Sequence, residues 1–356
     1  MDVPTTIDEI DPVFLSAVFG VDVSSVTATR IAAGAGFLGE LARIELSYSG
    51  EAGPATVIAK IPTSDAGMKP IGLMLDVYQR EHRAYAEAIP QLEIRTPAAY
   101  YNGRDGDDYC LILEDVAHLR AGDQHAGAGI ADGRAAMTAA AGLHARWWGR
   151  VDTLEWVPPI DSPLNLGLQA LLEESLPRIA DQLGDQIGSD LLGRIEEFIP
   201  TCRDMLVAYG EVSHTLIHGD FRLDNMFFAA DDELLLLDWQ LVGRGDGFAD
   251  ITPFLAGNLD SDLRREHELH LLRLYHDTIN DLGAGHVHFD DVVTNYRFSL
   301  NFWFAMYCYS AVTADPANER GVELWERVVS RLADAVRQHE PWELIGDHSR
   351  RPETLG

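Results

Sequence analysis

The stretch from Leu216 to Gln240 carries the polar residues with the clearest chemical pattern in this chain. Two apolar runs within it each end in a carboxylate, Asp220 and Asp238, and Asn225 follows the first carboxylate by five residues. A short loop can therefore hold the three side chains around one point. Carboxylate and amide oxygens are hard donors that bind Mg²⁺ and the phosphates it carries. The spacing favours a site for magnesium and phosphate.

The same stretch also fits an ordinary β-hairpin. Asp231-Asp232 is a common turn sequence, and Asp and Asn are frequent at strand ends. Turn chemistry, however, does not require the spacing of Asp220, Asn225 and Asp238. A site for magnesium and phosphate would also require elements earlier in the chain that position a nucleotide. Their presence or absence distinguishes this site from an ordinary β-hairpin.

A glycine-rich segment with Gly34, Gly36 and Gly39 lies between alternating apolar runs at 26–31 and 41–48. In a dinucleotide-binding unit this Gly-x-Gly-x-x-Gly spacing opens a helix, whereas a pattern of period two follows it here. A Rossmann oxidoreductase is therefore not expected. The strands and the glycines suit a flap whose backbone N–H groups cover the phosphates of ATP. A plain glycine turn is the alternative.

The apolar run at 57–62 carries a single lysine, Lys60. Burying an ammonium group without a partner is costly, and a phosphate together with a carboxylate would satisfy it. The helical pattern over 73–88 offers Glu81 as that carboxylate. Alternatively, Lys60 is an edge-strand charge that faces solvent, and Glu81 is a surface acid.

Two more strands are predicted at 97–101 and 109–113, and the second stops at Glu114. The carbonyl group of Glu114 and the N–H group of Val116 can pair with the adenine edge of ATP. An ordinary strand end fits these residues as well. We place the boundary between two lobes here.

Length and composition limit the class of protein. A chain of 356 residues is long enough for two lobes with separate cores. The net charge of −30 repels nucleic acid and anionic membranes, so neither is an expected partner. It would attract cationic substrates, although a solvated acidic surface explains the charge equally well.

The cellular location is expected to be cytoplasmic. The start of the chain, residues 1–4, is acidic and lacks a signal-peptide pattern. The richest apolar run, at 298–312, is shorter than the ~18 residues of a spanning helix. Cys110, Cys202 and Cys308 lie far apart, which suits a reducing compartment. No pattern specifies an oligomeric state.

Several residues in the C-terminal half have two interpretations. A helix is predicted over 134–150, in which His144 is expected to pack in the core. Trp147 and Trp148 belong to the core or to a substrate pocket. Asp250 either caps the helix that follows it or supports the loop of Asp220, and capping is the favoured interpretation.

The order of these features resembles the aminoglycoside phosphotransferase and choline kinase-like superfamily of small-molecule kinases. The resemblance covers roughly residues 25–310, and the helix segment 143–148 looks like the ecdysteroid-kinase-like branch. It implies an α+β, protein-kinase-like two-lobed fold. The N-terminal lobe, at 1–116, would contain an antiparallel sheet and bind nucleotide. The larger, mainly helical lobe, at 117–346, would bind substrate and carry out catalysis, and 347–356 would be a flexible tail.

The resemblance also implies the cofactors ATP and Mg²⁺ and a role for each polar residue. Asp220 is the implied catalytic base, and Asn225 and Asp238 are the implied magnesium ligands. Lys60, held by Glu81, would bind the α- and β-phosphates.

Arg222 stands where protein kinases often carry a lysine that contacts phosphate, so the resemblance implies that it neutralises the transferring group. A salt bridge to Asp224 or Asp246 is the alternative. Asp238 is not followed by the glycine of an Asp-Phe-Gly motif, and no Ala-Pro-Glu segment is present. A switchable activation loop and protein substrates are therefore not expected.

The predicted function is ATP- and Mg²⁺-dependent phosphorylation of a hydroxyl group on a small molecule. The alternatives are an aminoglycoside 3'-type resistance kinase and a non-catalytic, pseudokinase-like nucleotide-binding protein. An acidic pocket would favour binding of an aminoglycoside, and a pocket lined by aromatic side chains would favour binding of a steroid-like or lipid-like alcohol. The aromatic candidates for such walls are Trp147, Trp148, Phe302, Trp303, Phe304 and Tyr307.

Overall fold

The chain forms two compact units. The first contains Met1–Arg120 and Leu235–Leu241, and the second contains Ala121–Leu234 and Val242–Gly356. The first unit therefore ends at Arg120 rather than Val116, and it includes a segment that the sequence assigns to the second lobe. The computed structural model describes residues 1–31, 38–51, 53–211, 215–230, 233–284 and 287–345. Gly34, Gly36 and the predicted tail at 347–356 lie outside the described residues.

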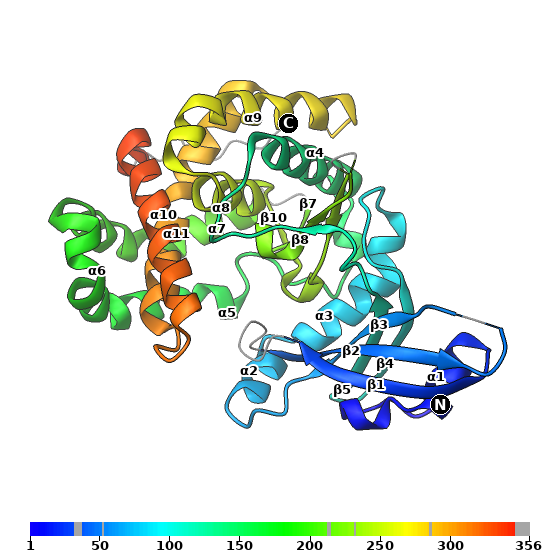
Figure 1. Ribbon diagram of the computed structural model, residues 1–356. Coiled ribbons are helices and arrows are strands. Elements are labelled where there is room, and N and C mark those ends of the chain that lie inside the picture. The colour runs from blue at the N-terminus through cyan, green and yellow to red at the C-terminus, as the bar shows by residue number, and fades with distance from the viewer. Residues whose placement is uncertain (32–37, 52, 212–214, 231–232, 285–286, 346–356) are drawn as a thin grey trace. The chain divides into compact units, whose positions relative to one another are not determined.

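The first unit is built on an antiparallel sheet with the strand order β1-β2-β3-β5-β4 (Figure 1). The predicted strands are confirmed, and the last two extend to a short turn at Gly106, which has φ +59°. The strands are β1 (Val23–Ile31), β2 (Gly39–Tyr48), β3 (Thr56–Pro62), β4 (Ala99–Asp105) and β5 (Asp108–Glu114).

Helix α1 (Pro12–Phe19) covers one face of this sheet. Asp11 caps it by accepting the N–H of Phe14 at 2.8 Å, and Pro12 occupies the first helical position. The buried residues of β3 that pack in the core with α1 are Val57, Ala59 and Ile61. Because alternate strand residues point to opposite faces, Lys60 points to the other face.

The helical region predicted at 73–88 begins earlier and is interrupted. Helix α2 (Met68–Met74) ends before Asp76, which adopts a left-handed conformation with φ 55°. Helix α3 (Val77–Arg83) starts after it and continues into a π turn, Ala84–Ala88. A left-handed residue cannot continue an α-helix, so the chain changes direction at Asp76.

The second unit is mainly helical, and the fully buried α8 lies at its centre. Helix α10 packs against α6, α8 and α11, and α4 packs against α9. The helices are α4 (Ile130–Trp147), α5 (Pro163–Leu166), α6 (Leu168–Phe198), α7 (Cys202–Glu211), α8 (Phe248–Asn258), α9 (Ser261–Asp281), α10 (Phe289–Thr313) and α11 (Glu319–His339).

Short strands frame the polar stretch around Asp220. Strand β7 (Thr215–Ile217) pairs antiparallel with β10 (Gly243–Gly245), which places Gly243 opposite Ile217. The remaining short strands are β6 (Arg120–Ala121), β8 (Met226–Phe228) and β9 (Leu234–Leu236). The predicted fold class is confirmed: an N-terminal antiparallel sheet and a larger helical C-terminal part. Among the described helices, none combines the length and apolar character that crossing a membrane requires.

Candidate active site

Lys60 is the centre of the polar cluster in the first unit. Its Nζ lies 2.8 Å from Oε1 of Glu81 on α3 and 2.9 Å from Oδ1 of Asp238. The edge-strand alternative for Lys60 is wrong, because β3 lies between β2 and β5. The predicted ion pair with Glu81 is present, and the pair with Asp238 joins residues that are 178 positions apart.

The two carboxylates keep Lys60 charged. Burial disfavours an ammonium group, but the charges of Asp238 and Glu81 outweigh burial and raise the pKa of Lys60 above its ordinary value. Glu81 is almost fully buried, whereas 37% of the Asp238 side chain is exposed. Asp238 is therefore held on one oxygen by Lys60 while its carboxylate stays accessible to solvent.

The backbone around Asp238 is held in an uncommon conformation. Asp238 has φ 62°, and it is followed by a 3₁₀ turn, Trp239–Leu241, whose Trp239 is fully buried. A left-handed non-glycine residue costs on the order of 1–3 kcal/mol and is found where the surrounding structure imposes it. The buried indole and the contact with Lys60 fix the direction of the carboxylate.

The connection after β5 is fixed by side chains of the same unit. Glu114 accepts the N–H of Ala98 through Oε2 at 3.2 Å, and Arg43 on β2 pairs with Asp115 at 2.7 Å. Burial opposes ionisation of Asp115, but the N–H of Ala117 and Arg43 lower its pKa. The backbone leading to Val116 is thus anchored on both sides.

Gly39 is the one glycine of the predicted flap that the described residues include. It begins β2, and a Cβ atom added to it would lie 3.5 Å from Cε of Lys60 and 3.3 Å from the carbonyl oxygen of Ile61. Gly39 thus lies beside the lysine, and the flap itself stays a prediction.

In the second unit, the Asp220 loop (residues 218–225) holds its central carboxylate on both oxygens. Arg222 donates from Nε to Oδ1 of Asp220 at 2.9 Å, and Asn225 donates from Nδ2 to Oδ2 at 2.7 Å. Gly219, with φ 79°, provides the turn out of β7. About a third of the Asp220 side chain, 29%, remains exposed. The carboxylate is oriented and accessible.

Asn225 uses only its amide nitrogen within this loop. Nδ2 donates to the main-chain oxygen of Asp220 at 2.9 Å as well as to its carboxylate. Among the residues described, its Oδ1 accepts no hydrogen bond, so this oxygen is available to a cation. An amide oxygen is one of the hard donors that Mg²⁺ accepts.

Arg222 forms the ion pair with Asp224 that was the alternative interpretation, at 3.3 Å, in addition to its contact with Asp220. Its Nη1 also donates to Oε1 of Gln124 at 3.4 Å, and the N–H of Gln124 donates to Asp224 at 2.8 Å. The negative charge of Asp220 raises the pKa of Arg222. The alternative partner, Asp246, instead lines a pocket beside α10.

Asp250 supports the Asp220 loop, and the prediction that it caps a helix is wrong. It is the third residue of α8, whose N-cap is Gly247. Its carboxylate accepts the N–H of His218 at 2.7 Å and that of Gly219 at 2.9 Å. The carboxylate of Asp250 and the N–H of His218 are buried, so the acid satisfies donors of the loop rather than those of the first turn of its own helix.

His144 completes this support from the side of α4. Its Nε2 lies 3.2 Å from Oδ2 of Asp250, and its Nδ1 lies 2.9 Å from the hydroxyl group of Tyr275. The predicted core position of His144 is confirmed, since the side chain is fully buried. Its role in holding Asp250 was not predicted.

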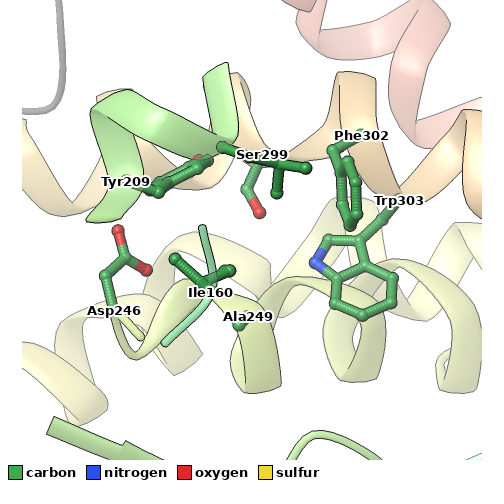
Figure 2. A pocket seen from close by; sticks show the side chains of 8 residues that line it. Ile160, Tyr209, Asp246, Ala249, Ser299, Phe302 and Trp303 are labelled. Carbon is green, nitrogen blue, oxygen red and sulfur yellow. The ribbon is translucent and has the colours of Figure 1, made fainter. Parts of the chain in front are cut away.

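The aromatic candidates fall into core and pocket positions. Trp147 and Phe304 are buried in the core, and Trp148 is partly exposed. Phe302 and Trp303 line a small pocket that also contains Asp246 (Figure 2). Tyr307 lies one turn further along α10, with its ring centroid 5.9 Å from that of Trp303.

Two residues of the site were missed from the sequence. Gln124 and Tyr275 carry no local motif and act through contacts with residues far away in the chain.

The fold is similar to those of solved small-molecule kinases. The GDP and kanamycin complex of APH(2")-IIia has 14% identity, with 92% of this chain and 97% of that chain covered and a TM-score of 0.56. Choline kinase from Cryptosporidium parvum has 12% identity, 92% coverage of both chains and a TM-score of 0.57. Spectinomycin phosphotransferase APH(9)-Ia, in complex with ADP and spectinomycin, has 12% identity, coverage of 94% and 99%, and a TM-score of 0.52. At these identities the likeness concerns the fold.

The sequence comparisons are more specific. Mouse acyl-CoA dehydrogenase family member 10 is 40% identical over 65 residues, which cover 14% of this chain and only 6% of the mouse protein. The profile of the ecdysteroid kinase-like family matches residues 33–284, well over half of the chain and including both the Lys60 cluster and the Asp220 loop. The chain belongs to the ecdysteroid kinase-like family.

Proposed function

We propose that this protein is a phosphotransferase that uses ATP and Mg²⁺ to phosphorylate a hydroxyl group of a small molecule. The observation that carries the proposal is the Asp220 carboxylate, which Arg222 and Asn225 hold on both oxygens while it stays accessible. Membership of a kinase-like family agrees with this chemistry.

Asp220 acts as the base. It accepts the proton of the acceptor hydroxyl as the hydroxyl oxygen attacks the γ-phosphorus, and the bond between that phosphorus and the bridging oxygen breaks to release ADP. The proton then leaves Asp220 for solvent. Because little covalent chemistry falls to the protein, positioning of the hydroxyl and neutralisation of charge supply the catalysis.

The nucleotide is held by residues of the first unit. Lys60 binds the α- and β-phosphates, and the flap glycines Gly34, Gly36 and Gly39 cover them with backbone N–H groups. The carbonyl of Glu114 and the N–H of Val116 pair with adenine.

Asn225 and Asp238 are the residues that would hold magnesium, which would neutralise charge on the phosphates. Arg222 adds positive charge next to Asp220. Every position that the resemblance assigns to catalysis carries a competent residue, which favours an enzyme over a pseudokinase. The buried free thiols of Cys110, Cys202 and Cys308 suit a protein of the reducing cytoplasm.

Transfer of labelled γ-phosphate from ATP into pooled aminoglycosides, amino alcohols, sterols and sugars tests the proposal. The wild-type protein should label a compound, and Asp220→Asn should not, although its shape and its affinity for ATP are retained. Labelling at the wild-type rate by Asp220→Asn would refute the assignment of the base. Failure of the wild type to bind ATP would refute the function itself.

A further inference from the structure

A small pocket beside α10 is bounded by aromatic and apolar side chains. Its volume of about 20 Å³ has room for one small polar group rather than a whole ligand. Figure 2 shows Asp246 at one end and Phe302 with Trp303 at the other. The lining is completed by Ile160, Leu206, Tyr209, Ala249 and Ser299.

Asp246 is a buried acid in which only one carboxylate oxygen accepts a hydrogen bond from the described residues. The residue is 4% exposed, and its Oδ1 accepts the N–H of Phe248 at 2.7 Å. Its Oδ2 is buried and has no hydrogen-bond partner among the described residues. Among the parts of the chain that the structure describes, no lysine, arginine or histidine lines the pocket. A buried carboxylate in this state is costly unless a donor or a cation reaches it.

The opposite end of the pocket carries two aromatic rings. The rings of Phe302 and Trp303 pack edge to face with their centroids 5.4 Å apart. Aromatic faces stabilise an ammonium group, and the effect grows when the site excludes water. The Oγ of Ser299 offers a further acceptor within the lining.

Helix α10 links this pocket to the Asp220 loop. Trp303 contacts Tyr307, which lies one helical turn further on. Burial and then the charge of Asp220 raise the pKa of Tyr307. Trp303 of the pocket lining therefore packs against a residue whose pKa depends on the charge of Asp220.

We propose that Asp246 binds the ammonium group of an amino alcohol, which is the acceptor whose hydroxyl group is phosphorylated. The choice of acceptor rests on the proposed function, whereas ammonium binding by the pocket does not. Asp246 is then a specificity-determining residue, and Phe302 and Trp303 complete the cation site. A purely structural role, in which Asp246 only caps α8 and its second oxygen binds water, is the competing explanation.

The test compares 2-phenylethylamine with 2-phenylethanol, because these probes differ chiefly in the ammonium group. Their binding to the full chain is measured by calorimetry or ligand-observed NMR without nucleotide at pH 8, above the pKa of about 7 that burial gives Asp246. Asp246→Asn keeps an oxygen for the N–H of Phe248 and so preserves the start of α8. Asp181→Asn, at an exposed position of α6, is the control for loss of one negative charge.

The wild type and Asp181→Asn should bind the amine about tenfold more tightly than the alcohol, as one charge-assisted hydrogen bond provides. Asp246→Asn should lose this preference while keeping its unfolding transition. Equal binding of amine and alcohol by the wild type, or a preference retained in Asp246→Asn, would overturn the proposal. ATP binding and labelled phosphate transfer, measured in parallel, report separately on the proposed function.

Discussion

Arg222 and Asp220 form an ion pair within one turn of chain, with Nε of Arg222 donating to Oδ1 of Asp220 at 2.9 Å. The pair directs the carboxylate, and Asn225 fixes its other oxygen. Because Asp224 and Gln124 hold the guanidinium in turn, the orientation of the base depends on a network rather than on one contact.

Replacing Arg222 by Met should therefore lower kcat by about 10- to 100-fold, since the base loses its orientation and the transferring group loses a nearby positive charge. KM for ATP should change little, because the phosphates are assigned to Lys60. Steady-state kinetics with the labelled acceptor measure both constants. Arg320→Met, at a side chain that is 77% exposed, is the matched control. A kcat within twofold of the wild type in Arg222→Met would show that the pair is only structural.

Lys60 should matter to folding as well as to nucleotide binding. Lys60→Met leaves Glu81 buried beside Asp238 without a counter-ion, and removing one partner of a buried pair costs about 3–5 kcal/mol. The free energy of unfolding in urea should fall by an amount of this order. In the double variant Lys60→Met/Glu81→Leu, part of the loss should be recovered because no buried acid is left on α3. The prediction fails if the double variant is less stable than Lys60→Met.

Gly247 permits the contact between His144 and Tyr275. A Cβ atom at this position would lie 2.3 Å from the Tyr275 hydroxyl oxygen and 2.6 Å from Nδ1 of His144, and both side chains are packed in the interior. Gly247→Ala should displace His144, loosen Asp250 and lower kcat with little effect on ATP affinity. Gly142→Ala is the control: it lies within α4 with open space around it, so it should leave kcat unchanged and stabilise slightly. Equal kcat values in the two variants would show that His144 does not support the Asp220 loop.

The sequence predicts this site best where chemistry depends on local spacing. Asp220 and Asn225 are five residues apart, so one loop brings them together. The pairing of Lys60 with Glu81 also follows from the sequence, because a lysine in a buried strand needs a partner and the next helix supplies one.

The remaining features depend on tertiary structure. Asp250 is 32 residues away in sequence from His218, whose N–H it accepts, and His144 is 106 residues away from Asp250. Local sequence does not reveal such distant contacts, so it favoured a helix cap at Asp250. The break at Asp76 depends on a left-handed residue that an apolar pattern does not reveal. Sequence patterns record which residues are polar, whereas the fold decides which buried donors they satisfy.

The stability of the protein should also report the state of Asp246. Burial raises the pKa of its carboxyl from 3.8 to about 7, although the N–H groups of Phe248 and Ala249 oppose the shift. Between these two values the folded protein keeps a proton that the unfolded chain releases. Stability therefore falls as the pH rises from about 4 to about 7, and the loss stays constant above that range.

Asp246→Asn removes this dependence because the amide does not titrate. The free energy of unfolding of Asp246→Asn relative to that of the wild type, measured without any amine, should rise by up to about 4 kcal/mol between pH 4 and pH 8. This value corresponds to the whole pKa shift of Asp246 at ~1.4 kcal/mol per pKa unit. Urea unfolding at the two pH values measures the difference, and Asp181→Asn should show no such change. A difference between Asp246→Asn and the wild type that is the same at pH 4 and pH 8 would mean that Asp246 titrates as an exposed acid. The carboxylate of an exposed acid is hydrated by water and does not require an ammonium group as a partner. This measurement therefore also tests the proposal that Asp246 binds the ammonium group of the acceptor.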